Sequence, residues 1–289
     1  MSPKTIDLHT HTSRSDGKLS PIELVRKAHN LKISALAITD HDTIDGVHEA
    51  QCAAQEHGIE IIPGVELSAH YGLGTLHILG YFVDITHPTL LHSLQEYRHF
   101  RDRRNPLILH RLRELGYPLD MEEVTRHAGG NVINRPHIAQ AMLNRGYVKN
   151  CKEAFDRFLG QGAAAYFAKE VYDAPKAVQI IHESGGLAVM AHPALLHDKG
   201  LVKIGHEIRR LHAIAHFDGI EAYHGDCISD HSDFFVAIAR ELNLFVTGGS
   251  DFHGDETHFM LGQTRFLSSI PYQLIDKMRN ALLERNTKI

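Results

Sequence analysis

The chain has 289 residues, which suits one large domain or one domain that carries an insertion. Its 43% hydrophobic and 22% charged fractions are those of a globular protein, and no apolar run approaches the roughly 18 residues of a membrane span. The net charge of -5 gives no reason to expect binding to long DNA. Three scattered cysteines indicate neither disulfides nor a thiolate zinc site. The N-terminus lacks the pattern of a signal peptide, so we expect a cytoplasmic protein with no membrane partner.

Strands and helices alternate at the start of the chain. Ser20, Pro21 and Glu23 have the spacing of a capping box with proline at the first helical position, which predicts a helix start. Because apolar runs flank that helix and the next one, the pattern indicates a βαβαβ unit with parallel strands and right-handed crossovers. The predicted strands are residues 5–9, 35–39 and 59–65, and the predicted helices are residues 21–31 and 46–57.

The alternation pauses after a fourth predicted strand at residues 77–83. Residues 88–158 have helical patterns without a convincing strand, which predicts a helical insertion domain at residues 88–169. The barrel domain would then comprise residues 1–87 and 170–289. One predicted long helix from about Pro88 is rich in arginine, either as a solvated face or as a surface that attracts anionic substrates. These arginines are Arg98, Arg101, Arg103, Arg104, Arg111 and Arg113.

The alternation then returns and continues to the end of the chain. We expect helical segments at residues 174–184, 192–215, 230–243 and 271–284, and strands at 187–191, 219–222 and 244–248. About seven strands are predicted in total, one fewer than in a regular eight-stranded β/α barrel. The fold class is therefore α/β.

Histidines and carboxylates follow the predicted strands. In β/α barrels the carboxyl ends of the strands build the active site, so these side chains should converge on one pocket. His9 and His11 are two residues apart and point to the same side, and Asp251 and His253 repeat this spacing. Burying so many ionisable groups without metal would be costly. Imidazole and carboxylate ligands suit zinc, manganese or iron(II), and Glu66 could bridge two ions.

The strand-end motifs resemble those of the polymerase and histidinol phosphatase (PHP) family. The resemblance implies a distorted seven-stranded β/α (TIM-like) barrel of the PHP type with a helical insertion. It also implies two to three divalent metal ions, with Mn²⁺ expected first and Zn²⁺ or Fe²⁺ as alternatives. The matching segments are Asp7-Leu8-His9-Thr10-His11, Ser15-Asp16-Gly17, Thr39-Asp40-His41-Asp42, Gly64-Val65-Glu66, Ala191-His192-Pro193 and Ser250-Asp251-Phe252-His253.

The same resemblance implies three sets of metal ligands. Two members depart from the common pattern, because Asp16 replaces a histidine of some relatives and His77 begins an apolar run instead of ending one. The first set would be His9, His11, Glu66 and Asp251, the second Glu66, His77 and His192, and the third Asp16, His41 and His253. The residues expected to take part in catalysis through these ions are Asp16, His41, Glu66, Asp251 and His253.

The insertion and the segment Asn134-Arg135-Pro136-His137-Ile138-Ala139 resemble the branch of the family that acts on small nucleotides. That branch includes 3′,5′-nucleoside bisphosphate phosphatases and enzymes that trim short oligoribonucleotides from the 5′ end. The expected partner is thus a small phosphorylated nucleotide or a short RNA. Arg135 and His137 would bind phosphate, His231 is a further candidate, and Glu221 and His224 would support the metal ligands.

Three other functions are open at the level of sequence. A histidinol phosphatase would use the same metal site, and an amidohydrolase also has an HxH motif on its first strand and an aspartate after its last. The TDHD and SDFH segments and Glu66 favour the phosphoesterase over the amidohydrolase. A non-catalytic nucleic-acid-binding module is the third alternative, and the intact set of candidate ligands argues against it.

Overall fold

The computed structural model describes residues 4–72, 74–130, 132–196, 200–225, 227–254 and 260–286. Eight strands form one sheet in the order β7-β6-β5-β4-β3-β2-β1-β8. The sheet curls into a nearly closed barrel, because the chain after β1 also bonds to β7 and the loop that follows it: Leu8 N donates to Gly248 O over 3.3 Å, and Asp251 N donates to His9 O over 2.9 Å. The strands are β1 (Thr5–Asp7), β2 (Ile33–Ile38), β3 (Glu60–Tyr71), β4 (Gly74–Tyr81), β5 (Leu187–Met190), β6 (Gly219–His224), β7 (Phe245–Gly249) and β8 (Ile270–Pro271).

The direction of β4 divides the barrel into two parallel halves. Strands β1, β2 and β3 are parallel to one another, as are β5, β6 and β7. The predicted parallel βαβαβ start is therefore confirmed. Strand β4 runs antiparallel to both neighbours, β3 and β5. Its first residues, not its last, thus lie beside the carboxyl ends of the other strands.

Two differences between the predicted and observed boundaries affect the topology of the sheet. Strand β3 does not end at residue 65 but continues to Tyr71, because its second half pairs with β4 as far as Gly74. The closing helix does not begin at residue 271, because Ile270 and Pro271 form the short strand β8 against β1. Proline has no N–H group and suits such an edge position. Strand β8 is the one missing from the predicted count of about seven.

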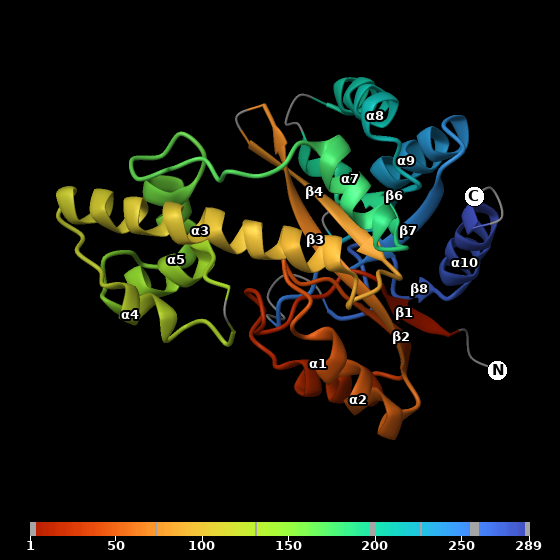
Figure 1. Ribbon diagram of the computed structural model, residues 1–289, viewed down its shortest axis with the longest axis horizontal. Coiled ribbons are helices and arrows are strands. Elements are labelled where there is room, and N and C mark those ends of the chain that lie inside the picture. The colour runs from red at the N-terminus through yellow and green to blue at the C-terminus, as the bar shows by residue number, and fades with distance from the viewer. Residues whose placement is uncertain are drawn as a thin grey trace.

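Helices cover the outer face of the barrel (Figure 1). Within β2, alternate side chains point to opposite faces: Ala35 and Ala37 pack inside the barrel, while Leu36 and Ile38 pack under the helices. The capping box predicted at Ser20 is present at the start of the first helix. The covering helices are α1 (Pro21–Asn30), α2 (Val47–His57), α7 (Ala174–Glu183), α8 (Leu201–Ala215), α9 (Ser229–Glu241) and α10 (Gln273–Asn286).

The predicted helical region at residues 192–215 is only partly one helix. A 3₁₀ turn, η2 (Pro193–Leu196), precedes α8, and residues 197–199 lie outside the described residues. Over the described ranges of the chain, no helix is both long enough and apolar enough to cross a membrane.

Residues 88–169, hereafter the helical insertion, project from one side of the barrel, away from α10 (Figure 1). Described residues of this segment form no sheet strand, as predicted. Side chains such as Ile108, Leu112, Ile138 and Phe158 pack into a core of their own. The elements are α3 (Pro88–Glu114), α4 (Met121–Thr125), α5 (Arg135–Asn144), α6 (Cys151–Ala154) and a π-helical turn, η1 (Phe155–Leu159).

Candidate active site

The first predicted ligand set converges at the carboxyl end of the barrel. Nε2 of His9 lies 3.4 Å from both Glu66 Oε2 and Asp251 Oδ1. Nε2 of His11 lies 3.3 Å from Glu66 Oε2 and 3.0 Å from Asp251 Oδ1. Ligands that are roughly 2.0–2.2 Å from one ion lie at about these separations. The four atoms could therefore hold one divalent ion.

The second predicted set shares Glu66 with the first. Oε1 of Glu66 lies 2.9 Å from His77 Nδ1 and 3.1 Å from His192 Nε2, and these two nitrogens are 3.2 Å apart. Oε2 of the same carboxylate faces the first set. Glu66 is thus placed as a bridging carboxylate. His77 lies early in β4, and the reversed direction of that strand explains why it does not end an apolar run as the other candidates do.

The third predicted set is wider and includes one unexpected member. Asp16 Oδ1 lies 3.4 Å from His253 Nε2, and Asp16 Oδ2 lies 3.8 Å from His41 Nε2. Nδ1 of His11 is 3.9 Å from Asp16 Oδ1, so His11 faces this set with its second ring nitrogen. Sequence reasoning placed His11 in the first set alone.

Several nitrogen and oxygen atoms of these nine candidate ligands are buried but make no hydrogen bond with any described residue. A buried polar atom left without a partner costs free energy, and a bound cation would remove that cost here. Burial opposes a charge on Glu66, yet His41, His77 and His9 hold its pKa well below the usual range. The residues therefore fit divalent ions. The unpartnered atoms are His9 Nε2, His11 Nδ1 and Nε2, Asp16 Oδ1, His41 Nδ1 and Glu66 Oε2.

Glu221 and His224 support the ligand sets from β6, as expected from the sequence. Glu221 Oε1 accepts a hydrogen bond from His9 Nδ1 over 2.9 Å, and Oε2 accepts one from the His192 backbone N–H over 2.8 Å. His224 Nε2 lies 3.4 Å from Asp251 Oδ2. Fixing Nδ1 of His9 keeps its Nε2 facing Glu66 and Asp251.

Sequence reasoning missed the roles of two buried aspartates that fix the ligand loops. Asp40 accepts hydrogen bonds from Thr12 N over 2.7 Å and Ser15 Oγ over 2.5 Å, which holds the loop that carries Asp16. Asp7 accepts from Ser250 N over 2.9 Å and so holds the residue before Asp251. Both aspartates lie inside the motifs that carry the family resemblance, but only the tertiary structure shows what they bind.

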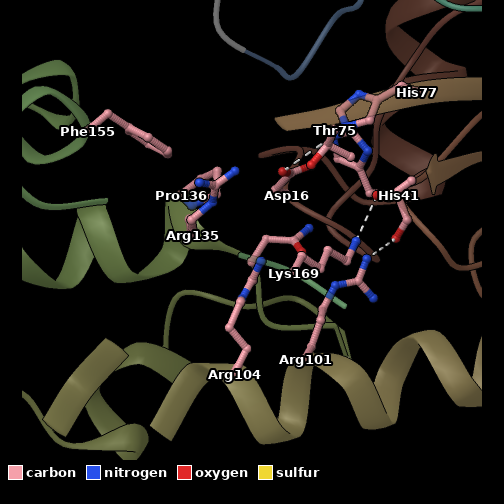
Figure 2. A pocket seen from close by; sticks show the side chains of 12 residues that line it. Asp16, His41, Thr75, His77, Arg101, Arg104, Arg135, Pro136, Phe155 and Lys169 are labelled. Atoms are coloured by element: carbon pink, nitrogen blue, oxygen red, sulfur yellow. Dashed lines mark hydrogen bonds and ion pairs between the residues drawn. The ribbon is translucent and has the colours of Figure 1, made fainter. Parts of the chain in front are cut away.

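A cavity of about 160 Å³ adjoins the second and third ligand sets. In Figure 2, Arg101 and Arg104 extend from α3, while Asp16, His41 and His77 lie across from them. The cavity thus joins the barrel to the helical insertion. It is lined by Asp16, His41, Ser68, Thr75, His77, Arg101, Arg104, Asn134, Arg135, Pro136, Phe155 and Lys169.

The six arginines of α3 have two distinct environments. Four form ion pairs with acidic residues on the outside of the helix, where Arg98 is half-buried and the other three are exposed: Arg98, Arg103, Arg111 and Arg113. The other two, Arg101 and Arg104, are buried at the cavity.

The cavity carries an excess of positive charge. Nε and Nη1 of Arg101 and Nε of Arg104 have no hydrogen-bond partner among the residues with described positions. Burial, followed by the charges of Arg135 and Arg101, lowers the pKa of Arg104 to about 9. Arg135 also lines the cavity, and its Nη1 donates to Leu159 O over 2.9 Å. These cations call for an anionic ligand.

The other two predicted phosphate ligands, His137 and His231, do not line this cavity. His137 Nδ1 accepts a hydrogen bond from the Asn134 backbone N–H over 3.0 Å, so its ring caps α5. Burial lowers the pKa of His137, which keeps the ring neutral and able to accept. His231 lies in the first turn of α9, and its buried Nδ1 has no partner among the described residues. Their binding of phosphate stays a prediction.

The barrel, the three ligand sets and the cavity together define a metal-dependent hydrolase. The chain belongs to the PHP domain family, whose model matches residues 7–186. It is 38% identical over 257 residues to a 5′-3′ exoribonuclease of Haemophilus influenzae, covering 86% of this chain and 90% of the relative. It is 34% identical over 256 residues to a 3′,5′-nucleoside bisphosphate phosphatase of Chromobacterium violaceum, covering 86% and 87%.

Two solved structures share the whole fold. An amidohydrolase from Chromobacterium violaceum, with bound sulfate and no metal, matches with a TM-score of 0.85 and 32% identity over 96% of each chain. A candidate metal-dependent phosphoesterase from Bifidobacterium adolescentis matches with a TM-score of 0.84 and 26% identity, covering 97% of this chain and 98% of the other. The PHP type of barrel is thereby confirmed.

Proposed function

We propose that the protein hydrolyses the 3′-phosphate of nucleoside 3′,5′-bisphosphates and yields a nucleoside 5′-monophosphate and inorganic phosphate. The observation that carries this proposal is the cationic cavity beside the ligand sets. A substrate with one phosphate at the metal ions would place its second phosphate against Arg101, Arg104 and Arg135. The bisphosphate phosphatase of Chromobacterium violaceum supports the same substrate class.

In this proposal the ions, with manganese first among the candidates, are held by the three ligand sets. When bound, divalent ions lower the pKa of a water molecule and neutralise charge on phosphoryl oxygens. Glu66 and Asp251 would fix the positions of the first two ions, and Asp16, His41 and His253 the third. These five residues therefore act in catalysis by holding the ions, and the arginines orient the substrate.

Short oligoribonucleotides with a 5′-phosphate are a second candidate substrate. The 38% identity to the exoribonuclease of Haemophilus influenzae supports this candidate. A short RNA presents several phosphates in a row, so a phosphodiester could lie at the ions while the 5′-phosphate meets the arginines. The net charge of -5 gives no electrostatic reason for tight binding to long DNA, so we expect none.

The charge of the cavity disfavours two of the alternatives. Histidinol phosphate carries an ammonium group, which Arg101, Arg104 and Arg135 would repel. Cyclic amides are neutral, so they would bring no negative charge to the guanidinium nitrogens of Arg101 and Arg104 that have no partner among the described residues. A protein of the same fold bears the amidohydrolase name, so cyclic amides belong among the substrates that are tested.

Comparing adenosine 3′,5′-bisphosphate with adenosine 3′-monophosphate tests the proposal, because the two differ only in the 5′-phosphate. We expect kcat/KM to be at least about tenfold higher for the bisphosphate, since a charge-assisted bidentate contact contributes about 1.4 kcal/mol or more. Histidinol phosphate and a cyclic amide serve as controls. Equal kcat/KM values for the two adenosine nucleotides would refute the role of the cavity.

A further inference from the structure

We propose that Asp42 is a positioning residue that sets the substrate-binding wall of the cavity by fastening the first helix and the last residue of the helical insertion to the barrel. The inference rests on the proposed function in one respect, namely that the cavity receives the second phosphate. No sequence motif assigns this role to Asp42. Its basis is a network of contacts around one buried carboxylate.

Asp42 is anchored in the barrel beside the candidate ligands. It directly follows His41, and its backbone N–H donates to Glu66 O over 2.9 Å. Its Oδ1 accepts a hydrogen bond from the Ser68 N–H over 2.7 Å, and its Oδ2 accepts one from Ser68 Oγ over 3.0 Å. Its φ angle of 49° is unusual for a residue other than glycine. Such strain persists only where surrounding contacts impose it.

The same carboxylate binds one cation from the first helix of the helical insertion and one from its last residue. Arg101, on the first helix of the insertion, donates from Nη2 to Asp42 Oδ2. Lys169, where the chain returns to the barrel, donates from Nζ to the same oxygen. The side chains of Asp42, Arg101 and Lys169 are 0%, 2% and 10% exposed. Two chain segments that are 68 positions apart thus meet on one oxygen atom.

These contacts leave binding capacity for a ligand. Asp42 engages only Nη2 of Arg101, which also donates to His41 O over 3.3 Å, while Nε and Nη1 have no partner among the described residues. Lys169 is held by Asp42 and by Ser68 Oγ at 2.7 Å, and it also lines the cavity. The carboxylate of Asp42 balances the charge of Arg101, and Arg104 and Arg135 add positive charge at the cavity.

Asp42 forms both ion pairs in a buried environment. A buried ion pair is weak evidence for a contribution to stability. Fixing the orientation of two cations is the better-supported purpose, because a small displacement of a substrate-binding group can cost about 100-fold in rate.

The test is Asp42→Asn in the manganese-loaded protein, with kcat and KM measured for adenosine 3′,5′-bisphosphate and for adenosine 3′-monophosphate. We expect KM for the bisphosphate to rise about 10- to 100-fold, with little change in KM for the monophosphate and in bound manganese. Asp45→Asn is the matched control, because Asp45 also pairs with α3, through Arg98 at 3.7 Å, but outside the cavity. It should leave both KM values unchanged.

Several outcomes would overturn the proposal: an unchanged or lower KM for the bisphosphate, an equal rise for both substrates, or loss of manganese. Should Asp42→Asn fail to fold, Lys169→Gln keeps the Asp42–Arg101 pair and must still raise KM for the bisphosphate selectively. If the wild-type protein hydrolyses neither nucleotide, the proposed function fails separately. The affinity of the metal-stripped protein for inorganic phosphate, which should be weaker in Asp42→Asn, then decides the role of Asp42.

Discussion

Glu66 is the residue on which the candidate active site depends most. Its Oε2 faces His9 and His11, and its Oε1 faces His77 and His192. Because one carboxylate contributes to two ligand sets, two ions bound there would lie close to each other. Such pairing suits phosphoester hydrolysis, in which charge develops on both the attacking and the leaving oxygen.

Glu221→Gln tests how the ligands are oriented. An amide in place of the carboxylate weakens the hydrogen bond from His9 Nδ1, so we expect metal affinity to fall about 10- to 100-fold while excess manganese restores turnover. His9→Ala and Asp251→Ala remove ligand atoms themselves and should abolish turnover at any manganese concentration. Isothermal titration with manganese and assays at saturating metal measure both effects. Unaltered rates in the two alanine variants would refute the ligand assignment.

The residues at strand ends could be predicted from the sequence, while the cavity residues could not. His9, His11, Asp251 and His253 stand in local motifs with strand spacing, so their convergence follows from the barrel geometry. All six arginines of α3 look alike in the sequence. Only packing against the barrel separates buried Arg101 and Arg104 from their exposed neighbours.

Strand β7 and the chain after β1 approach each other so closely that the barrel needs glycine at their contact. A Cβ atom on Gly249 would lie 2.3 Å from His9 Cβ and 2.4 Å from His9 N. These segments carry three members of the first ligand set, with His9 and His11 on one side and Asp251 on the other. Closure of the barrel therefore brings these three ligands together.

Gly249→Ala should consequently impair both stability and metal binding. Overpacking typically costs about 1–3 kcal/mol of unfolding free energy, and the displaced His9 should weaken manganese binding. Ser20→Ala is a suitable control, because loss of this helix cap should cost about 1 kcal/mol far from the ligands. Urea unfolding and manganese titration compare the two variants. Normal metal affinity in Gly249→Ala would show that the close contact does not position His9.

Local sequence patterns predicted where the strands lie but not the direction of every strand. The parallel start followed from alternating strands and helices, but nothing in the sequence around His77 indicated that β4 is reversed. Strand direction is set by the pairing of β4 with β3 and β5, which is a tertiary property. The length of β3 was underestimated for the same reason.

At the scale of the whole molecule, the helical insertion and the barrel share one site. Besides the contacts at Asp42, the insertion approaches the loop that carries Asp16, where a Cβ atom on Gly129 would lie 2.5 Å from Ser13 Cβ. The presence of a helical insertion could be predicted from the sequence. Its placement against the metal end could not, because it depends on such contacts between distant segments.

Metal binding should stabilise the whole fold, because the ligands come from β3, β4 and the segments that follow β1, β2, β5 and β7. A ligand at 100 times its Kd adds about 2.7 kcal/mol, which for a protein of this size raises Tm by roughly 5 to 10 °C. Thermal melts of metal-stripped protein with and without manganese measure this shift. His9→Ala should show a much smaller one, and an equal shift in that variant would place the binding elsewhere.

The most direct test of the account is phosphate release from adenosine 3′,5′-bisphosphate by manganese-loaded protein, with adenosine 5′-monophosphate and histidinol phosphate in parallel. We predict that the manganese-loaded protein releases phosphate from the bisphosphate, with adenosine 5′-monophosphate as the product. This release should stop when metal is stripped and return when it is restored. We predict no release from the other two substrates. Absence of release from the bisphosphate, or faster release from histidinol phosphate, would contradict the account.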